Sequence, residues 1–138
     1  MELEIFSLAD FAADYGNGKL TVVGTFDTIF TPNLPVVHPH CSVAIRMRVA
    51  NSEAGHHDFE IKVIDPDGKV FQNIKGGMDI KVNPNADYNT MNLVMNLNNL
   101  KIQKAGKYAF EFHFDNEFRS GLKLHVVQAM PPGMVKAA

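Results

Sequence analysis

Apolar residues occur at every second position through most of this 138-residue chain, and they almost never follow three-to-four spacing. Successive side chains of an extended strand point to opposite faces, so this alternation gives each segment one apolar and one polar face. The clearest stretch is residues 41–50, where the apolar positions are Cys41, Val43, Ile45, Met47 and Val49. The same alternation recurs in residues 59–63, 78–82, 91–97, 108–114 and 122–126. The pattern therefore predicts β-strands with one buried face each.

Turn sequences separate these segments at the spacing typical of an all-β fold. "YGNGK" at 15–19 joins a first strand near residues 6–15 to the next, and Asp-Pro-Asp-Gly at 65–68 predicts a tight turn with Gly68 at positive φ. Gly76-Gly77 interrupts another run and predicts a bulge or a change of sheet. The count is eight or nine short strands. We predict an all-β fold, an antiparallel β-sandwich of about eight strands that is immunoglobulin-like or a related Greek key.

The segment "LKIQKAGKYAFEF" at residues 100–112 adds a more specific indication. Gly106 and then Tyr108 lead into an alternating aromatic strand. In immunoglobulin-like sandwiches a tyrosine near the start of a strand bonds its hydroxyl to upstream backbone, an arrangement called the tyrosine corner. We predict this structural role for Tyr108, with Gly106 in the turn before it. The alternative is an ordinary half-buried aromatic residue.

Composition favours one soluble domain. Apolar residues make up 46% and charged residues 20%, and the length suits a single core. We predict one β-sandwich domain over residues 1–130 and a surface tail over 131–138, where prolines and a glycine break the pattern. The net charge of −2 comes from scattered residues, so neither nucleic acid nor an anionic membrane is expected as a partner.

Cysteine usage and the first residues favour a cytoplasmic location. One cysteine cannot form an internal disulfide, and "MELEIFSLADF" lacks the charged and apolar regions of a secretory signal. No apolar stretch approaches the roughly 20 residues that span a bilayer. A removed leader is the alternative.

The stretch "LPVVHPHCSV" at residues 34–43 looks most like chemistry, since it carries His38 and His40. Pro39 favours an extended His38, which places both imidazoles on the same side of a strand-like segment. Such a pair can chelate a metal, but a catalytic zinc or iron site normally has a third protein ligand. Spacing selects no third ligand among His56, His57, His113 and His125. The alternative is a proline-rich loop whose histidines are satisfied locally.

Two further motifs resemble functional sites, but their residues favour structural roles. Cys41 shares the parity of Val43, which predicts a buried, inert thiol with a raised pKa, and the adjacent His40 points to the other face. Asp65 and Asp67 resemble half of a calcium loop, but a third oxygen ligand and the distal glutamate are missing. A hairpin turn needs neither of these calcium ligands, so it is the favoured interpretation of this segment.

Outward polar residues provide candidate contacts for a ligand or partner. Arg46 and Arg48 form a small positive stripe that can bind a carboxylate or phosphate; if their strand pairs with residues 58–63, one register sets Arg48 opposite Glu60 as an ordinary ion pair. An asparagine-rich segment can present amides to a sugar or a partner strand, or form a solvated face, through Asn92, Asn96 and Asn98.

An ordered set of motifs in residues 9–68 resembles a family of small bacterial proteins of unknown function. The motifs are "DFA", "GKL", a hydrophobic pair with glycine, "FD.I", "LP..HP", a basic alternating strand and "D.DG". The resemblance implies a compact β-sandwich and brings no activity or catalytic residues.

Two classes of function are carried forward. The first is a non-catalytic binding or structural module without a cofactor, because the sequence offers no acid–base pair, phosphate cradle or complete metal set. The second is a small metal-dependent enzyme or metal-binding protein built on His38, His40 and a third histidine. Open sandwiches leave strand edges that another chain can cover, so a protein partner or a homo-oligomer through a strand edge is also expected.

Overall fold

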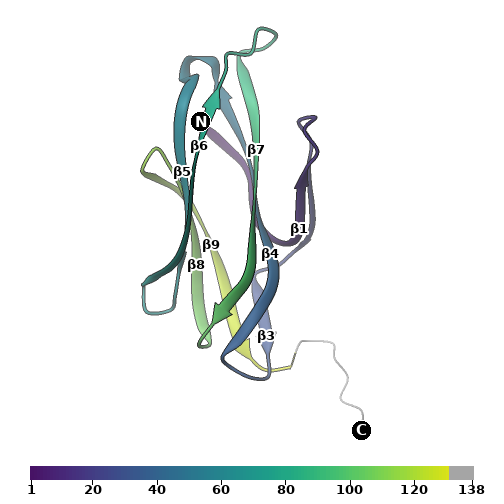
Figure 1. The fold of residues 1–138 in the computed structure, drawn as a ribbon, viewed down its shortest axis with the longest axis vertical. Coiled ribbons are helices and arrows are strands. Elements are labelled where there is room, and N and C mark those ends of the chain that lie inside the picture. The colour runs from purple at the N-terminus through teal and green to yellow at the C-terminus, as the bar shows by residue number, and fades with distance from the viewer. Residues whose placement is uncertain (131–138) are drawn as a thin grey trace.

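Nine strands make up most of the computed structural model, which describes residues 1–130 (Figure 1). Their bounds are β1 Glu2–Asp14, β2 Leu20–Thr25, β3 Thr28–Thr31, β4 Val36–Ala50, β5 Gly55–Ile64, β6 Val70–Ile80, β7 Tyr88–Ile102, β8 Gly106–Phe114 and β9 Glu117–Gln128, with a 3₁₀ turn at Asn51–Glu53. The all-β prediction is confirmed. Across residues 1–130, no helix is long and apolar enough to cross a membrane. The tail predicted at 131–138 lies outside the described residues.

The strands form two sheets. The first sheet has the order β2-β1-β4-β7 and the second has the order β3-β9-β8-β5-β6. Every neighbouring pair is antiparallel except β3 and β9, which run parallel from Thr28 opposite His125 to Thr31 opposite Gln128. The expectation of a purely antiparallel sandwich is therefore wrong for this pair. Strands so distant in sequence are not joined by a hairpin, so nothing in the connection forces them to be antiparallel.

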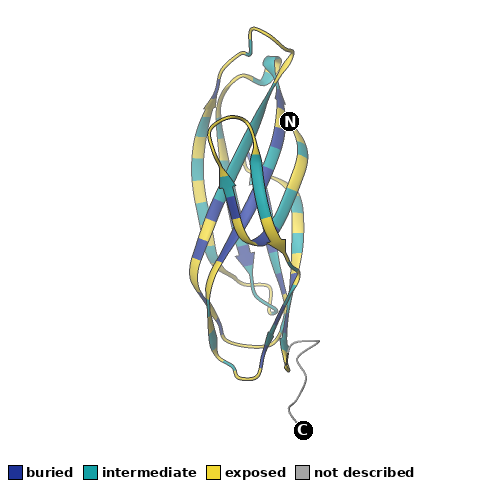
Figure 2. Ribbon diagram, turned by 90° about the vertical axis from the view of Figure 1, so that its right-hand side faces the viewer, coloured by how far each residue is buried: buried dark blue, intermediate teal, exposed yellow. Residues whose placement is uncertain are grey.

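The two sheets pack face to face around one apolar core. The ring of Phe6 in the first sheet lies 6.1 Å from that of Phe112 in the second. From Tyr108 to Phe114 in β8 the buried and partly exposed residues alternate strictly, and banding of this kind is visible on the strands in Figure 2. The largest fully buried side chains come from both sheets: Phe110, Phe112, Phe114, Ile45, Met47, Ile61, Leu97, Leu100, Ile102 and Leu124. The period-two pattern in the sequence thus marks the core faces.

Strand β1 pairs with two neighbouring strands, and it bends at Ala9, where it changes from one to the other. The first part of β1 pairs with β4 as far as Ala9 opposite Ser42, and from Ala9 onward it pairs with β2. The resulting β1–β2 hairpin folds back over the outer face of the first sheet, where Arg46 Nη1 donates to the carbonyl oxygen of Gly18 at 2.8 Å. The hairpin stands to one side of the body in Figure 1 and in front of it in Figure 2. This cover explains why the outward Ser42 and Ala44 are fully buried.

The alternation of faces shifts once along β4 and β7. Leu97 and Leu100 are both buried in the core although they are three positions apart, which in a regular strand would place them on opposite faces. Asn99, which lies between them, has a φ of 55°. The pairing of β4 with β7 is interrupted at Pro39 and Asn99 and continues in the same register on both sides of them. Pro39 is tolerated here because β1 stops pairing with β4 at Ser42, so this part of β4 has a free side and needs fewer ladder hydrogen bonds.

Gly76-Gly77 does not form the predicted bulge or sheet change. Both glycines lie within β6 in continuous register with β5, whose irregularity falls at Val63/Ile64 instead. A Cβ on Gly76 would lie 2.4 Å from Cζ of Phe59, the residue opposite it. Position 76 therefore needs a glycine, because the Phe59 ring occupies the space that a side chain would fill.

Candidate binding surface

A row of hydrogen-bonded polar pairs runs along the outer face of β4 and β7. In each pair, a β4 side chain donates to the Oδ1 of the asparagine opposite it in register. The bonds are His40 Nδ1 to Asn98 at 2.8 Å, Ser42 Oγ to Asn96 at 2.8 Å and Arg46 Nη1 to Asn92 at 3.1 Å. We call these six residues the polar ladder. The sequence marked most of them separately, and the strand register brings them together.

The ladder leaves hydrogen-bond donors on its outer side. Each asparagine uses its oxygen within the pair, and within residues 1–130 its Nδ2 group donates to no other protein atom. An amide nitrogen carries two donors. Because alternate residues of a strand lie about 7 Å apart, Asn96 and Asn98 present their amino groups at that spacing. The face is therefore suited to a ligand rich in hydrogen-bond acceptors.

A hollow of about 420 Å³ lies at one end of the ladder, between the hairpin tip and the first sheet. Its lining is Ile5, Gly18, Lys19, Leu20, Thr21 and Arg46. The charged lining residues, Lys19 and Arg46, are both cationic, and Ile5 and Leu20 supply apolar surface. Arg46 also bonds Asn92, so the hollow and the ladder are continuous.

Arg48 lies beside this face but pairs differently from the prediction. Its Nε lies 3.6 Å from a carboxylate oxygen of Glu4, and its guanidinium carbon lies 4.2 Å above the Tyr88 ring. The pairing of Arg48 with Glu60 is wrong because the chain crosses from one sheet to the other between β4 and β5. Glu60 instead accepts a hydrogen bond from Asn73 at 2.9 Å in the second sheet.

His38 and His40 do not share a face, so the expectation of a same-side pair is wrong. Paired residues lie on the same face of a sheet; His38 is opposite the buried Leu100, whereas His40 is opposite the exposed Asn98. The shift of alternation at Asn99 causes the difference. The His38 ring lies 5.9 Å from that of Phe26, and burial lowers the pKa of His38. Among the residues that the structure describes, no group of three His, Cys, Asp or Glu side chains is arranged to hold a metal.

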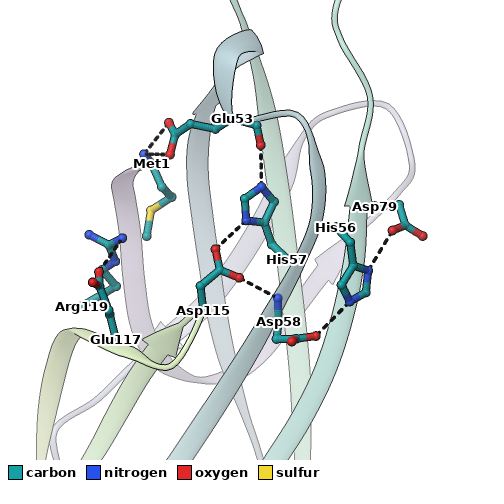
Figure 3. A network of polar contacts seen from close by, with 9 residues as sticks. All are labelled: Met1, Glu53, His56, His57, Asp58, Asp79, Asp115, Glu117 and Arg119. Atoms are coloured by element: carbon teal, nitrogen blue, oxygen red, sulfur yellow. Dashed lines mark hydrogen bonds and ion pairs between the residues drawn. The ribbon is translucent and has the colours of Figure 1, made fainter.

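His56 and His57 belong to a network of polar contacts at one end of the molecule (Figure 3). The two nitrogens of His56 lie 2.8 Å from Asp79 Oδ1 and 2.9 Å from Asp58 Oδ1. These two carboxylates raise the pKa of His56, Asp79 contributing more than Asp58. All three side chains are exposed, so water screens the contacts.

His57 is more enclosed and links three segments. Its Nδ1 donates to Asp115 Oδ2 at 2.6 Å, its Nε2 donates to the carbonyl oxygen of Glu53 at 2.5 Å, and its ring stacks on Phe114 at 4.9 Å. Both partners are acceptors, so the two bonds need a proton on each nitrogen, and Asp115 followed by the Glu53 carbonyl raises the pKa of His57. The Glu53 carboxylate in turn contacts the Met1 ammonium at 2.7 Å (Figure 3). This network was not predicted, because Met1, Asp79 and Asp115 are far along the chain from His56 and His57.

Cys41 is buried in the core, as its parity predicted. Burial, with a smaller effect of Asp10, raises the pKa of its thiol to about 11. A thiol in this state is a poor nucleophile.

Tyr108 and Gly106 lie in a braced corner at the start of β8. Tyr108 Oη donates to the carbonyl oxygen of Lys104 at 2.7 Å. Gly106 has a φ of 137°, and Pro66 from the β5–β6 turn fills the space beside it, since a Cβ there would lie 2.9 Å from Pro66 Cγ. Lys104 also pairs with Asp67 of that turn.

The Asp-Pro-Asp-Gly segment is a hairpin turn whose acids have structural partners. Asp65 Oδ1 accepts bonds from the backbone nitrogens of Asp67 and Lys69, each at 2.9 Å. Gly68 has a φ of 84° and donates its N–H to the Asp65 carbonyl oxygen at 3.0 Å. The carboxylates are thereby engaged in the turn and, for Asp67, with Lys104.

A second hollow, of about 390 Å³, lies on the second sheet and was not predicted. Its lining is Asp58, Phe59, Glu60, Lys75, Gly76, His113 and Asn116. His113 Nε2 lies 3.1 Å from Glu111, and Glu60 lies opposite His113 in register. Charges of both signs line the hollow, so it shows less preference for one ligand charge than the hollow beside Arg46.

Together, these observations define an all-β protein of two packed sheets with an organised polar row on one outer face. The chain belongs to the family of unknown function DUF6941, whose model matches residues 4–127. This match confirms the expectation, drawn from the motifs in residues 9–68, of a family without an assigned function. No curated protein has a sequence that matches this chain.

Proposed function

We propose that the protein is a non-catalytic recognition module of immunoglobulin-like fold that binds a carboxylate-bearing carbohydrate on the outer face of its first sheet. The observation that carries the proposal is the polar ladder, in which asparagine oxygens are used internally and amide donors face outward.

The strand order supports the immunoglobulin-like assignment. In such domains, strands A, B and E share one sheet, and strands C, F and G share the other. Here β1, β4 and β7 occupy the places of A, B and E, and β5, β8 and β9 those of C, F and G, with β6 added beside C. The Tyr108 bond to Lys104 lies at the start of the strand in the F place, where the tyrosine corner belongs.

The partners of the reactive side chains support a non-catalytic role. The nitrogens of His56 and His57 contact carboxylates and a backbone carbonyl of the chain itself. The Asp65 carboxylate closes a turn, and the Cys41 thiol is buried. These contacts give each group a structural function in the folded chain.

The chemistry of the ladder and the adjoining hollow supports the ligand class. Asn96 and Asn98 offer donors to hydroxyl and ring oxygens of a sugar, while the Arg46 guanidinium is suited to a carboxylate. Ligand sites commonly combine apolar surface with a few convergent polar groups, and Ile5 and Leu20 supply that surface in the hollow.

An oligosaccharide array with neutral and uronate-containing members tests the proposal. We expect binding to uronate-containing oligosaccharides, with weaker signals from their neutral counterparts. Asn96→Asp keeps the acceptor for Ser42 but removes the amide donors and adds a negative charge, so it should weaken binding at least about tenfold.

Asn85→Asp is the matched control, since it makes the same change at an exposed loop position between β6 and β7. It should leave the affinity unchanged. No binding by the unmodified protein, or equal losses in the two folded variants, would contradict the proposal.

A further inference from the structure

The outer edge of β7 is long and has few protective features. β7 pairs only with β4, and its register is unbroken from Tyr88 opposite Ala50 to Asn98 opposite His40. Over residues 88–98 the strand carries no charge, proline or glycine, and it spans much of the height of the molecule in Figure 1. Across the described chain, no backbone hydrogen bond joins this span from residue 89 onward to any strand other than β4. The backbone groups that point away from β4 are therefore available to another strand.

The other outer strands of the two sheets offer less. β3 has four residues, and β2 has six, with an irregular backbone at Gly24, whose φ is 70°. β6 carries Lys75 and Asp79. In β7 itself, the irregular backbone at Asn99 lies beyond the unbroken span. Short length, irregular backbone and charge each discourage pairing between edges, so residues 88–98 form the edge most open to a partner.

Two side chains on the core face of this edge are incompletely covered. Met91 and Leu93 pack against the core but are only partly buried, whereas Met95 and Leu97 are buried. β7 has a neighbouring strand on one side only, which leaves the other side of these residues open. A strand added there with apolar inward residues would remove that apolar surface from water and gain the hydrophobic contribution of its area.

The sequence of this edge has nearly the same chemical pattern in both directions. Residues 91–97 read "MNLVMNL", with Val94 at the centre. The positions one and three residues from Val94 on either side hold leucine or methionine, and the positions two residues away hold asparagine. An antiparallel second copy centred on Val94 therefore meets apolar side chains with apolar ones and amides with amides. An unrelated strand needs a matching pattern to do the same, so the edge favours a second copy.

We propose that two copies of the chain pair antiparallel along β7, about a two-fold axis at Val94. In this register, Met91 of each copy lies opposite Leu97 of the other. Leu93 lies opposite Met95 in the same way, so the second copy covers the open side of the two partly buried residues. The two first sheets become one continuous sheet, which is a closed, isologous arrangement.

The outer face of the joined strands is also matched. Asn92 of each copy lies opposite Asn96 of the other. The Oδ1 of each asparagine accepts one bond within its own copy, from Arg46 and Ser42 respectively. An amide oxygen has two lone pairs, so the amide donors that face the interface have acceptors across it.

Disulfide formation tests the axis. Residues directly opposite each other in an antiparallel pair have Cα atoms about 4.5–5.5 Å apart, a distance that a disulfide spans. Val94→Cys should therefore form disulfide-linked dimers in a mild oxidising buffer, while the native Cys41 is buried with its pKa raised to about 11 and does not compete. Val82→Cys is the control, because Val82 is 61% exposed on the β6–β7 loop, and it should stay monomeric on a non-reducing gel. Equal linking of the two variants would overturn the proposal.

A mixing experiment tests the register. In the proposed pairing, the two copies of residue 92 lie four positions out of register, about 13 Å apart along the strands, and the same holds for residue 96. Asn92→Cys and Asn96→Cys should each remain monomeric when oxidised alone, and an equimolar mixture of the two should give disulfide-linked dimers. A mixture that links no more than the separate variants would contradict this register.

Sedimentation equilibrium tests the association itself. The unmodified chain should show a concentration-dependent dimer and no larger species. Val94→Asp places two carboxylates opposite each other at the axis, so it should raise the dissociation constant at least about fivefold, whereas Val82→Asp should leave it unchanged. Circular dichroism and thermal unfolding check that each variant is folded. A monomer at every concentration, or equal dissociation constants for the two folded variants, would overturn the pairing without affecting the carbohydrate test.

Discussion

The hydroxyl of Tyr108 lies 2.7 Å from the Lys104 carbonyl oxygen, and the corner around it is held from a second direction by Pro66 against Gly106. Burial raises the pKa of Tyr108, so its hydroxyl remains a proton donor at neutral pH. At this scale, Tyr108 is held by a carbonyl four residues upstream, whereas Gly106 is covered by a residue distant in sequence, because the β5–β6 turn packs on the segment before β8.

Replacing Tyr108 by phenylalanine should lower the free energy of unfolding by about 1 kcal/mol, because the Lys104 carbonyl loses its donor. Urea unfolding at neutral pH measures the change. Tyr15→Phe is the control, since Tyr15 is 67% exposed and should tolerate the substitution. Equal midpoints of urea unfolding for the two variants would show that the hydrogen bond of Tyr108 does not stabilise the fold.

At the scale of elements, β6 shows how one strand depends on the ring of another. The Phe59 ring lies over Gly76, and the register between β5 and β6 stays regular through both glycines. The strand β7 shows the opposite case, in which Asn99 at a φ of 55° shifts the alternation and moves Leu100 into the core. Both effects depend on the facing strand, so the sequence of one strand does not specify them.

Gly76→Ala should lower the free energy of unfolding by about 1–3 kcal/mol, since the new methyl group overlaps the Phe59 ring and displaces it. Gly121→Ala in β9 is the matched control, because a Cβ there meets its nearest neighbour at 3.7 Å, an ordinary contact. The control should be neutral or slightly stabilising, as alanine is preferred to glycine within a strand. Chemical unfolding of both variants checks the difference, and equal effects would contradict it.

On the scale of the whole molecule, His57 connects parts of both sheets at one end. It joins the turn after β4, through Glu53, to the β8–β9 turn, through Asp115 (Figure 3). The hydrogen bond from His57 lowers the pKa of Asp115, and the same contact raises the pKa of His57. The pair therefore stabilises the fold when the imidazole is protonated and the carboxylate is ionised.

The pH dependence follows from these directions. The contribution of His57 is fully present below its ordinary pKa of 6.5 and is lost as the pH rises through the raised value in the folded protein. The contribution of Asp115 is present above its ordinary pKa of 3.8 and is lost as the pH falls through the lowered value. We expect the free energy of unfolding to decline as the pH rises above 6.5.

Asp115→Asn should flatten that decline, and it is a suitable variant because asparagine tolerates the φ of 50° found at this position. Some slope should remain, since the pKa of His56 is also raised. Thermal unfolding between pH 5 and about 8.5 measures the two profiles. Identical slopes would show that the His57–Asp115 contact does not couple protonation to folding.

The sequence by itself determined the strands and their buried faces. Alternation along residues 41–50 and 108–114 is a local property that the pleat of a strand turns directly into one inward face, and the turn at 65–68 is equally local. Inward Cys41 followed from the same parity.

Only the tertiary structure decided which faces and edges meet. It placed Arg48 beside Glu4 rather than Glu60, separated His38 from His40, joined β3 to β9 in parallel and folded the β1–β2 hairpin over the first sheet. It also assembled the polar ladder from residues of β4 and β7. The physical reason is that the two-residue repeat of a strand sets the face to which each side chain points, and this repeat is local. Strand pairing depends instead on how segments far apart in the sequence pack together and exclude water. No local pattern specifies that packing.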